Sequence, residues 1–155
     1  MTFPRSMSSV GWAGWILAGA LLMAGCGDEE DPVEPDDAPP DLSGTYTLVS
    51  IVALVTGGTV MTPPDATGTF TLRQSTPVGQ EASGTMTMDI TIPDGLGGTT
   101  DIVDTGTYTV RRDGTWEQAG NLVQARGTYT FVNNVLTVEV TEPPLNVSTT
   151  VWQRQ

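Results

Sequence analysis

Polar and apolar residues alternate with a period of two along most of the chain after residue 42. In the clearest run, residues 85–92, the apolar positions on one face are Met86, Met88, Ile90 and Ile92. The same alternation recurs in residues 108–111 and 136–140. Because successive side chains of a strand point to opposite faces, this pattern predicts half-buried strands of an antiparallel sheet with one face toward a core.

A second regularity is Gly-Thr followed by a large apolar residue. These triplets begin at Gly44, Gly68, Gly84, Gly106, Gly114 and Gly127. Threonine and aromatic residues suit a pleated surface, and we expect each glycine to lie where a turn passes into a strand. The irregular spacing of the triplets argues against a solenoid repeat.

These patterns predict eight strands and a last one. Their expected ranges are 44–54, 59–62, 67–74, 83–92, 100–111, 114–123, 126–132, 135–141 and 147–154. Asp113-Gly114 and Asn133-Asn134 predict tight hairpins. Short strands joined by close turns indicate an all-β domain. We expect an antiparallel up-and-down β-barrel of eight or nine strands, because closure removes exposed edges, with a β-sandwich as the alternative.

The first residues of the chain follow a different pattern. Arg5 precedes an apolar run of 14 residues from Val10 to Met23. As a helix this run would span ~21 Å, less than the ~30 Å hydrocarbon core of a bilayer. We therefore interpret residues 1–25 as a cleaved signal peptide rather than a permanent transmembrane helix.

Met23-Ala24-Gly25-Cys26 resembles the bacterial lipobox, with Met23 where leucine is most common. The resemblance implies cleavage between Gly25 and Cys26 and acyl chains such as palmitate on the Cys26 sulfur. Two acyl chains suffice for stable membrane anchoring. The next residue is Gly27 rather than aspartate, which by the same resemblance favours the outer membrane over the inner membrane of the cell envelope. An ordinary signal peptide with an incidental cysteine is the alternative.

Residues 26–41 carry eight of the 18 acidic residues and four prolines. Like charges and prolines keep such a segment extended, so we expect a disordered tether. Its spacing lacks the Asp-x-Asp-x-Asp-Gly order of a calcium loop. The sequence thus predicts a signal peptide (1–25), a lipidated tether (26–41) and a β domain (42–155).

The residue types that are missing limit the chemistry. The chain has no histidine and no lysine, and Cys26 is its one cysteine. This excludes a Ser-His-Asp triad, a lysine Schiff base and a disulfide within one chain. The arginines are scattered, which argues against nucleic-acid binding. We expect no enzyme, no cofactor and no metal site. Catalysis would require paired carboxylates, such as Asp101 with Asp104 or Asp89 with Glu139.

Five segments of the β domain carry a family resemblance: Asp41–Ser50, Asp113–Trp116, Gly127–Phe131, Leu136–Val138 and Thr149–Arg154. With these segments, residues 41–155 resemble bacterial lipocalin-like lipoproteins. The family often has Gly-Thr-Trp in the first strand, where this chain has Tyr46. The resemblance implies a calycin-like barrel in which Arg154 packs over the Tyr46 ring as a cation–π contact.

The candidate barrel interior consists of large apolar residues. They are Tyr46, Phe70, Met86, Met88, Tyr108, Trp116, Tyr129, Phe131 and Trp152. One hypothesis is that they enclose a small apolar ligand, and the other is that they fill the core of a structural or adhesion module of the envelope. Loops 55–66 and 93–100 are the candidate contact regions of such a module, whose protein partner the sequence does not identify.

Overall fold

The computed structural model describes residues 37–53 and 57–155. They belong to a compact unit, Pro32–Gln155. The predicted signal peptide, the cleavage site at Gly25 and Cys26, and most of the predicted tether lie outside the described residues. Every strand pairing and every core residue of the described chain lies within 42–154, so we infer that this unit folds by itself.

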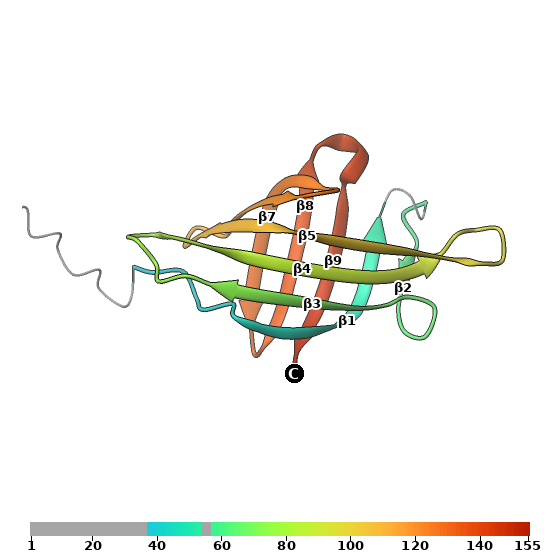
Figure 1. Cartoon of the computed structure of the whole chain (residues 1–155), viewed down its shortest axis with the longest axis horizontal. Helices are drawn as coiled ribbons and strands as arrows, with labels where there is room; N and C mark the ends of the chain where they lie inside the picture. Colours follow the sequence, from blue (N-terminus) through green and yellow to red (C-terminus); the bar gives the residue numbers. More distant parts are fainter. Residues whose placement is uncertain (1–36, 54–56) are drawn as a thin grey trace, which may run out of the picture. The chain divides into compact units, whose positions relative to one another are not determined.

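The described residues form nine strands (Figure 1). Their bounds are β1 Gly44–Ala53, β2 Val60–Met61, β3 Thr67–Gln74, β4 Glu81–Pro93, β5 Thr99–Arg111, β6 Thr115–Gly120, β7 Gln124–Val132, β8 Val135–Glu142 and β9 Ser148–Arg154. A single turn of 3₁₀ helix, η2 (Pro144–Asn146), precedes β9. Within the described ranges, no helix has the length and apolar character needed to cross a bilayer.

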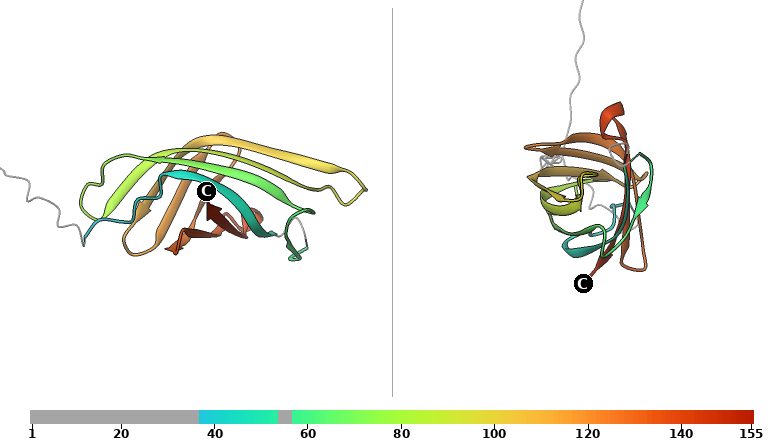
Figure 2. Two further views of the ribbon diagram at one scale, coloured as in Figure 1. Left: turned by 90° about the horizontal axis from the view of Figure 1, so that it is seen from below. Right: turned by 90° about the vertical axis from the view of Figure 1, so that its right-hand side faces the viewer.

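The nine strands form one antiparallel sheet that closes on itself. From β3 to β9 each strand pairs with the next, β1 pairs with β3, and β9 returns to pair with β1. Eight strands therefore make a closed barrel, while β2 adds a short ladder to the second half of β1. Figure 2 shows the strands curving around a common interior, with the long β4–β5 hairpin running beyond the others. The predicted up-and-down barrel is confirmed and the sandwich alternative is wrong.

Two hairpin turns agree with the sequence prediction. Asn133 and Asn134 between β7 and β8 both have positive φ, 54° and 63°, as a two-residue turn of the primed type requires. Gly114 before β6 has φ 89°, and its N–H donates to the Arg111 carbonyl oxygen at 3.0 Å. Asparagine and glycine tolerate these conformations better than other residues, which fixes the register of the adjoining strands.

The prediction that each glycine of the Gly-Thr triplets marks the start of a strand is wrong at three positions. Gly84, Gly106 and Gly127 lie inside β4, β5 and β7. A Cβ at Gly127 would overlap the Glu139 carbonyl oxygen, and Gly84 and Gly106 are confined in the same way by backbone of adjacent strands. These glycines let neighbouring backbones approach closely where the barrel curves, which is a role of glycine within strands rather than at turns.

The third residue of each triplet points into the barrel. These six side chains are all buried and are Tyr46, Phe70, Met86, Tyr108, Trp116 and Tyr129. At about 25 cal/mol per Å² of apolar surface, each buried aromatic side chain contributes roughly 4–6 kcal/mol of transfer free energy. The alternation predicted from the sequence is therefore the alternation between core and surface.

Residues 37–41, which the sequence pattern assigns to the tether, contact the barrel. Arg112 Nη1 lies 3.0 Å from an Asp37 carboxylate oxygen, and Gln74 Nε2 donates to the Pro40 carbonyl oxygen at 3.1 Å. Arg154 Nη2 donates to the Asp41 carbonyl oxygen at 2.7 Å. These bonds hold the chain that enters β1 against one end of the barrel.

Candidate functional site: a cavity at one end of the barrel

One end of the barrel is closed by Arg154. Its guanidinium carbon lies 5.4 Å from the centre of the Tyr46 ring and 4.8 Å from that of Phe131. Arg154 Nε donates to the Tyr46 hydroxyl at 3.2 Å, and that hydroxyl donates to the Leu42 carbonyl oxygen at 2.7 Å. Burial raises the pKa of Tyr46, while the Arg154 charge opposes this shift. The predicted cation–π contact is confirmed, and we call this end, with Tyr46, Phe131 and Arg154, the closed end.

Aromatic rings fill the middle of the barrel. Tyr108 stacks on Trp116 with ring centres 5.3 Å apart and planes 12° apart. Phe70 lies 6.2 Å from Trp116 and 5.2 Å from Trp152 between ring centres. Phe70, Trp116 and Trp152, from β3, β6 and β9, also form one wall of a cavity, and we call these three residues the aromatic floor.

Beyond the aromatic floor lies an apolar cavity of about 190 Å³, which we call the barrel cavity. Its wall includes aliphatic side chains from β1, β4, β5 and β8, among them Ile51, Met88, Ile90, Ile92, Ile102, Val138 and Val140. The corner between β8 and β9 forms the rim. Leu145 at this rim is 83% exposed, so the mouth of the barrel cavity opens to solvent.

The volume restricts what the barrel cavity can hold. Pockets for drug-sized ligands span ~300–1,000 Å³, whereas an engineered apolar cavity of ~150 Å³ in another protein binds benzene. At about 190 Å³, this cavity has room for a molecule of one or two rings or for a short chain. It does not reach the ~300 Å³ lower limit of drug-sized pockets.

The structure divides the nine candidate interior residues into two groups. Four line the barrel cavity: Phe70, Met88, Trp116 and Trp152. The other five pack outside its wall: Tyr46, Met86, Tyr108, Tyr129 and Phe131. Most of the large side chains therefore fill the core, as the alternative hypothesis expects, and a smaller set leaves space at one end.

Sequence reasoning missed part of the wall. Alternation placed Ile92, Val138 and Val140 on the inward face but did not separate them from ordinary core residues. Leu145 was missed because it lies in η2, outside every predicted strand. Val147 was taken as the first residue of the last strand, but β9 begins at Ser148 and Val147 belongs to the corner around η2. Only the closed sheet brings this corner over the open end of the barrel.

Asp104 is the one charged residue that is buried among the described residues, with 1% of its surface exposed. One carboxylate oxygen accepts from the Leu122 N–H at 2.9 Å, and the other accepts from the Val123 N–H at 3.2 Å and lies 3.5 Å from Gln118 Nε2. The carboxylate thus satisfies the backbone of the turn between β6 and β7. Because Gln118 and Val123 line the barrel cavity, Asp104 fixes part of its wall.

The carboxylate pairs considered for catalysis do not come together. Asp101 is exposed on the outer face of β5, where it accepts a hydrogen bond from Thr91 Oγ1 at 2.7 Å, while Asp104 points inward. Asp89 and Glu139 are exposed on β4 and β8, which are not neighbours in the sheet. Among the described residues, no group of three or more acidic side chains gathers in a way that could hold a metal ion.

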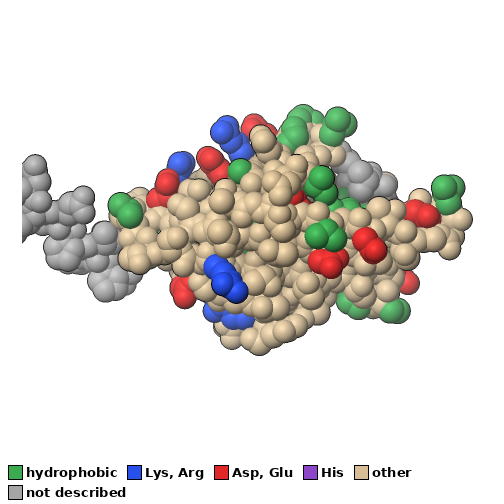
Figure 3. Space-filling model, in the orientation of Figure 1, with side chains coloured by type: hydrophobic (Ala, Val, Ile, Leu, Met, Phe, Trp, Pro, Cys, Tyr) green, Lys and Arg blue, Asp and Glu red, His purple; other side chains and the backbone are tan. Residues whose placement is uncertain are grey.

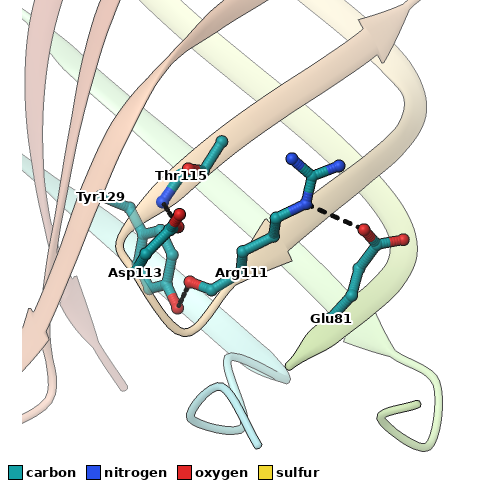
Figure 4. Close-up of polar contacts among 5 residues, drawn as sticks. All are labelled: Glu81, Arg111, Asp113, Thr115 and Tyr129. Carbon is teal, nitrogen blue, oxygen red and sulfur yellow. Dashed lines mark hydrogen bonds and ion pairs between the residues drawn. The ribbon is translucent and has the colours of Figure 1, made fainter. Parts of the chain in front are cut away.

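The turn before β6 is held by polar contacts (Figure 4). Arg111 Nε lies 2.9 Å from a Glu81 carboxylate oxygen, and the Tyr129 hydroxyl donates to the Arg111 carbonyl oxygen at 3.0 Å. An Asp113 oxygen accepts from the Thr115 N–H at 2.9 Å, and hydrogen bonds from Thr115 lower the Asp113 pKa. Burial, with a smaller effect of the Asp113 charge, raises the pKa of Tyr129 to about 12. These groups stabilise the turn that leads into β6.

A wider depression of about 790 Å³ lies open on the outside of β5, β6 and β7. Threonines line it together with Glu117, Gln124, Arg126 and Glu142. On the face drawn in Figure 3, the hydrophobic side chains lie in small groups that other side chains and backbone separate. The barrel cavity is therefore the better candidate site, because it is more enclosed and its wall is apolar.

Comparison with known proteins adds no assignment to this geometry. No protein-family model, curated protein or solved structure matches this chain.

Proposed function

We propose that this protein is a lipid-anchored protein of the bacterial cell envelope whose barrel binds a small apolar molecule. The observation that carries the proposal is the barrel cavity, which is apolar, opens beside the exposed Leu145 and ends on the aromatic floor. Its volume of about 190 Å³ limits the ligand to one or two rings or a short chain. The closed eight-stranded barrel supports the resemblance to lipocalin-like lipoproteins.

The anchoring part of the proposal rests on the sequence. The lipobox-like Met23-Ala24-Gly25-Cys26 would supply the lipidated residue, and the acidic segment after Cys26 would separate the barrel from the membrane. Gly27 favours the outer membrane. Acyl chains on Cys26 would contribute ~0.8 kcal/mol per buried CH₂.

Ligand binding can be tested by NMR on residues 27–155, which contain the whole barrel. Methionine methyl groups labelled with ¹³C give three signals, from Met61, Met86 and Met88. Met88 lines the barrel cavity and Met86 does not. Titration with toluene, naphthalene and a long-chain fatty acid should shift the Met88 signal saturably for the two small compounds. The fatty acid should shift it only weakly, because no more than the end of its chain fits into the available volume.

A matched pair of variants locates the ligand. Val140→Phe fills the barrel cavity and should abolish the Met88 response, since Val140 lines it. Val132→Phe places the same side chain at a position that is 63% exposed and outside the cavity, and it should bind like the wild type. Equal loss of binding in both variants would contradict the assignment of the site.

Anchoring is tested separately. Cys26→Ser should abolish incorporation of radiolabelled palmitate and release the chain from the outer-membrane fraction. Cys26 lipidation is excluded if the wild-type chain takes up no label. A labelled chain found only with the inner membrane would overturn the choice of membrane but not the anchor.

A structural envelope module without a ligand is the second candidate. The dense packing of the closed end and the modest volume of the barrel cavity favour it. A Met88 signal that responds to none of the small compounds would establish this second candidate over the first.

A further inference from the structure

Trp116 lies in the aromatic floor with an unpartnered indole N–H. Its side chain is fully buried, and Nε1 is the one buried side-chain nitrogen or oxygen in the described residues without a hydrogen-bond partner. The other indole of the floor differs, because Trp152 Nε1 donates to Thr150 Oγ1 at 2.8 Å. Buried polar groups of native proteins are almost always hydrogen-bonded, since an unmade bond leaves the cost of desolvation uncompensated.

No side chain of the described residues accepts the Trp116 N–H. The two tyrosines whose rings contact the indole act as hydrogen-bond donors to other groups: Tyr108 donates to Gln74 Oε1 at 3.3 Å and Tyr129 to the Arg111 carbonyl oxygen at 3.0 Å, and neither hydroxyl accepts from Trp116 Nε1. The plane of the indole is restrained by stacking on Tyr108, with ring planes 12° apart, by an edge contact with Phe70 and by a tilted contact with Tyr129. A turn of the ring toward another acceptor would break these contacts.

The same residue lines the barrel cavity, but Nε1 itself has almost no accessible surface, so a bound molecule reaches the N–H only when a neighbouring side chain moves aside. We propose that the molecule bound in this cavity carries an acceptor oxygen that receives the Trp116 Nε1–H. This inference rests on the proposed function and narrows the ligand to a small apolar compound with a carbonyl, ether or hydroxyl oxygen. The aliphatic wall takes its hydrocarbon part, and the oxygen satisfies the buried donor. The flexible, half-buried Met88 in the same wall can adjust as the ligand enters.

The test compares acetophenone with ethylbenzene, which have nearly the same shape and differ by a carbonyl group in place of a CH₂. Residues 27–155 contain two tryptophans, Trp116 and Trp152, so ¹⁵N labelling gives two indole signals. Both compounds should shift the Met88 methyl signal. Ring currents of either ligand should shift both indole signals. Acetophenone should place the Trp116 indole proton further downfield than ethylbenzene does, and this difference should be absent at Trp152, whose indole is already bonded to Thr150.

An isosteric substitution removes the donor. Incorporating 3-benzothienylalanine at Trp116 replaces the N–H by sulfur with little change in shape. This replacement should weaken the binding of acetophenone, relative to that of ethylbenzene, by about five- to tenfold. Because the ratio of the two dissociation constants is compared between proteins, differences in ligand hydration cancel. The same replacement at Trp152, whose N–H is already satisfied, should leave the ratio unchanged.

The outcomes separate the two proposals. The proposed acceptor oxygen is wrong if the ratio of the two dissociation constants is unchanged in the Trp116 variant and acetophenone causes no downfield shift of the Trp116 indole signal, relative to ethylbenzene, in the wild type. Binding in the cavity would then still stand. If neither compound shifts Met88, the proposed function fails and the acceptor with it. A ratio that changes equally at Trp116 and Trp152 also overturns the inference, since it shows a general effect of the substitution.

Discussion

Arg154 and Tyr46, 108 residues apart in sequence, join the last strand of the barrel to the first. The guanidinium carbon lies 5.4 Å from the ring centre, and Arg154 Nε donates to the Tyr46 hydroxyl at 3.2 Å. The two residues are also paired in the ladder between β1 and β9. Backbone and side chains therefore close the sheet at the same place, and the closed end excludes water from the rings beneath it.

Arg154→Ala should destabilise the barrel by about 2 kcal/mol, since it removes cation–π contacts with two rings and the hydrogen bonds to Tyr46 and Asp41. Arg154→Lys keeps the charge but loses the planar fork, so its free energy of unfolding should fall between those of the wild type and Arg154→Ala. Arg73→Ala, at an exposed position, is the control and should change it by less than about 0.5 kcal/mol. Urea unfolding measures all three. Equal stability of Arg154→Ala and Arg73→Ala would contradict this role.

Asp104→Asn should cost about 2–3 kcal/mol. The carboxylate accepts from the N–H groups of Leu122 and Val123 in a buried site, whereas an amide presents only one acceptor oxygen and places its own donors against an N–H. Asp101→Asn, on the exposed face of the same strand, should be nearly neutral. Hydrogen exchange at the Leu122 and Val123 amides should accelerate in the first variant and not in the second. Unchanged exchange in Asp104→Asn would show that the turn does not depend on the carboxylate.

Gly127→Ala tests whether the glycines inside strands permit close backbone approach. A Cβ there overlaps the Glu139 carbonyl oxygen, and since that oxygen belongs to backbone, β7 and β8 must separate, at a cost of about 3 kcal/mol. Gly79→Ala is the matched control. Gly79 has φ 59° and no atom within 4 Å of the added Cβ. The substitution should therefore lower the free energy of unfolding only by the cost of placing alanine in a left-handed conformation, about 1–2 kcal/mol. Thermal unfolding compares the two, and a smaller loss at Gly127 than at Gly79 would rule out the steric explanation.

Features that depend on neighbouring residues could be predicted from the sequence pattern, whereas features that depend on residues far apart in the chain could not. Strand alternation depends on neighbouring residues, so the strands and the inward face of β4 were predicted correctly. The positions of Gly84 and Gly106 were misread because a strand's own sequence does not show where the next backbone passes. The Arg154–Tyr46 contact was expected from a family resemblance, not from periodicity. The unpartnered Trp116 N–H could not be predicted, because the absence of an acceptor becomes visible only in the packed interior.

The three tyrosines predict how the barrel responds to alkali. Burial is the main cause that raises the pKa of Tyr46 and Tyr108 above 10.0, and it raises that of Tyr129 to about 12. A group with a raised folded-state pKa stabilises the fold fully below its unfolded pKa, and this contribution is lost as pH rises through the folded value. The barrel should therefore lose stability between pH 10 and about 12.

Tyrosinate absorbance measures this directly. At pH 10.0, the ordinary tyrosine pKa, the urea-unfolded chain should have half of its tyrosines ionised, while the folded barrel should show a much smaller fraction of tyrosinate. As pH rises further, absorbance should increase together with the loss of the β-sheet circular dichroism signal, because ionisation of a buried phenol favours unfolding. A titration with its midpoint near 10 and an intact circular dichroism spectrum would mean that the phenols are solvated, and with them the interior of the closed end.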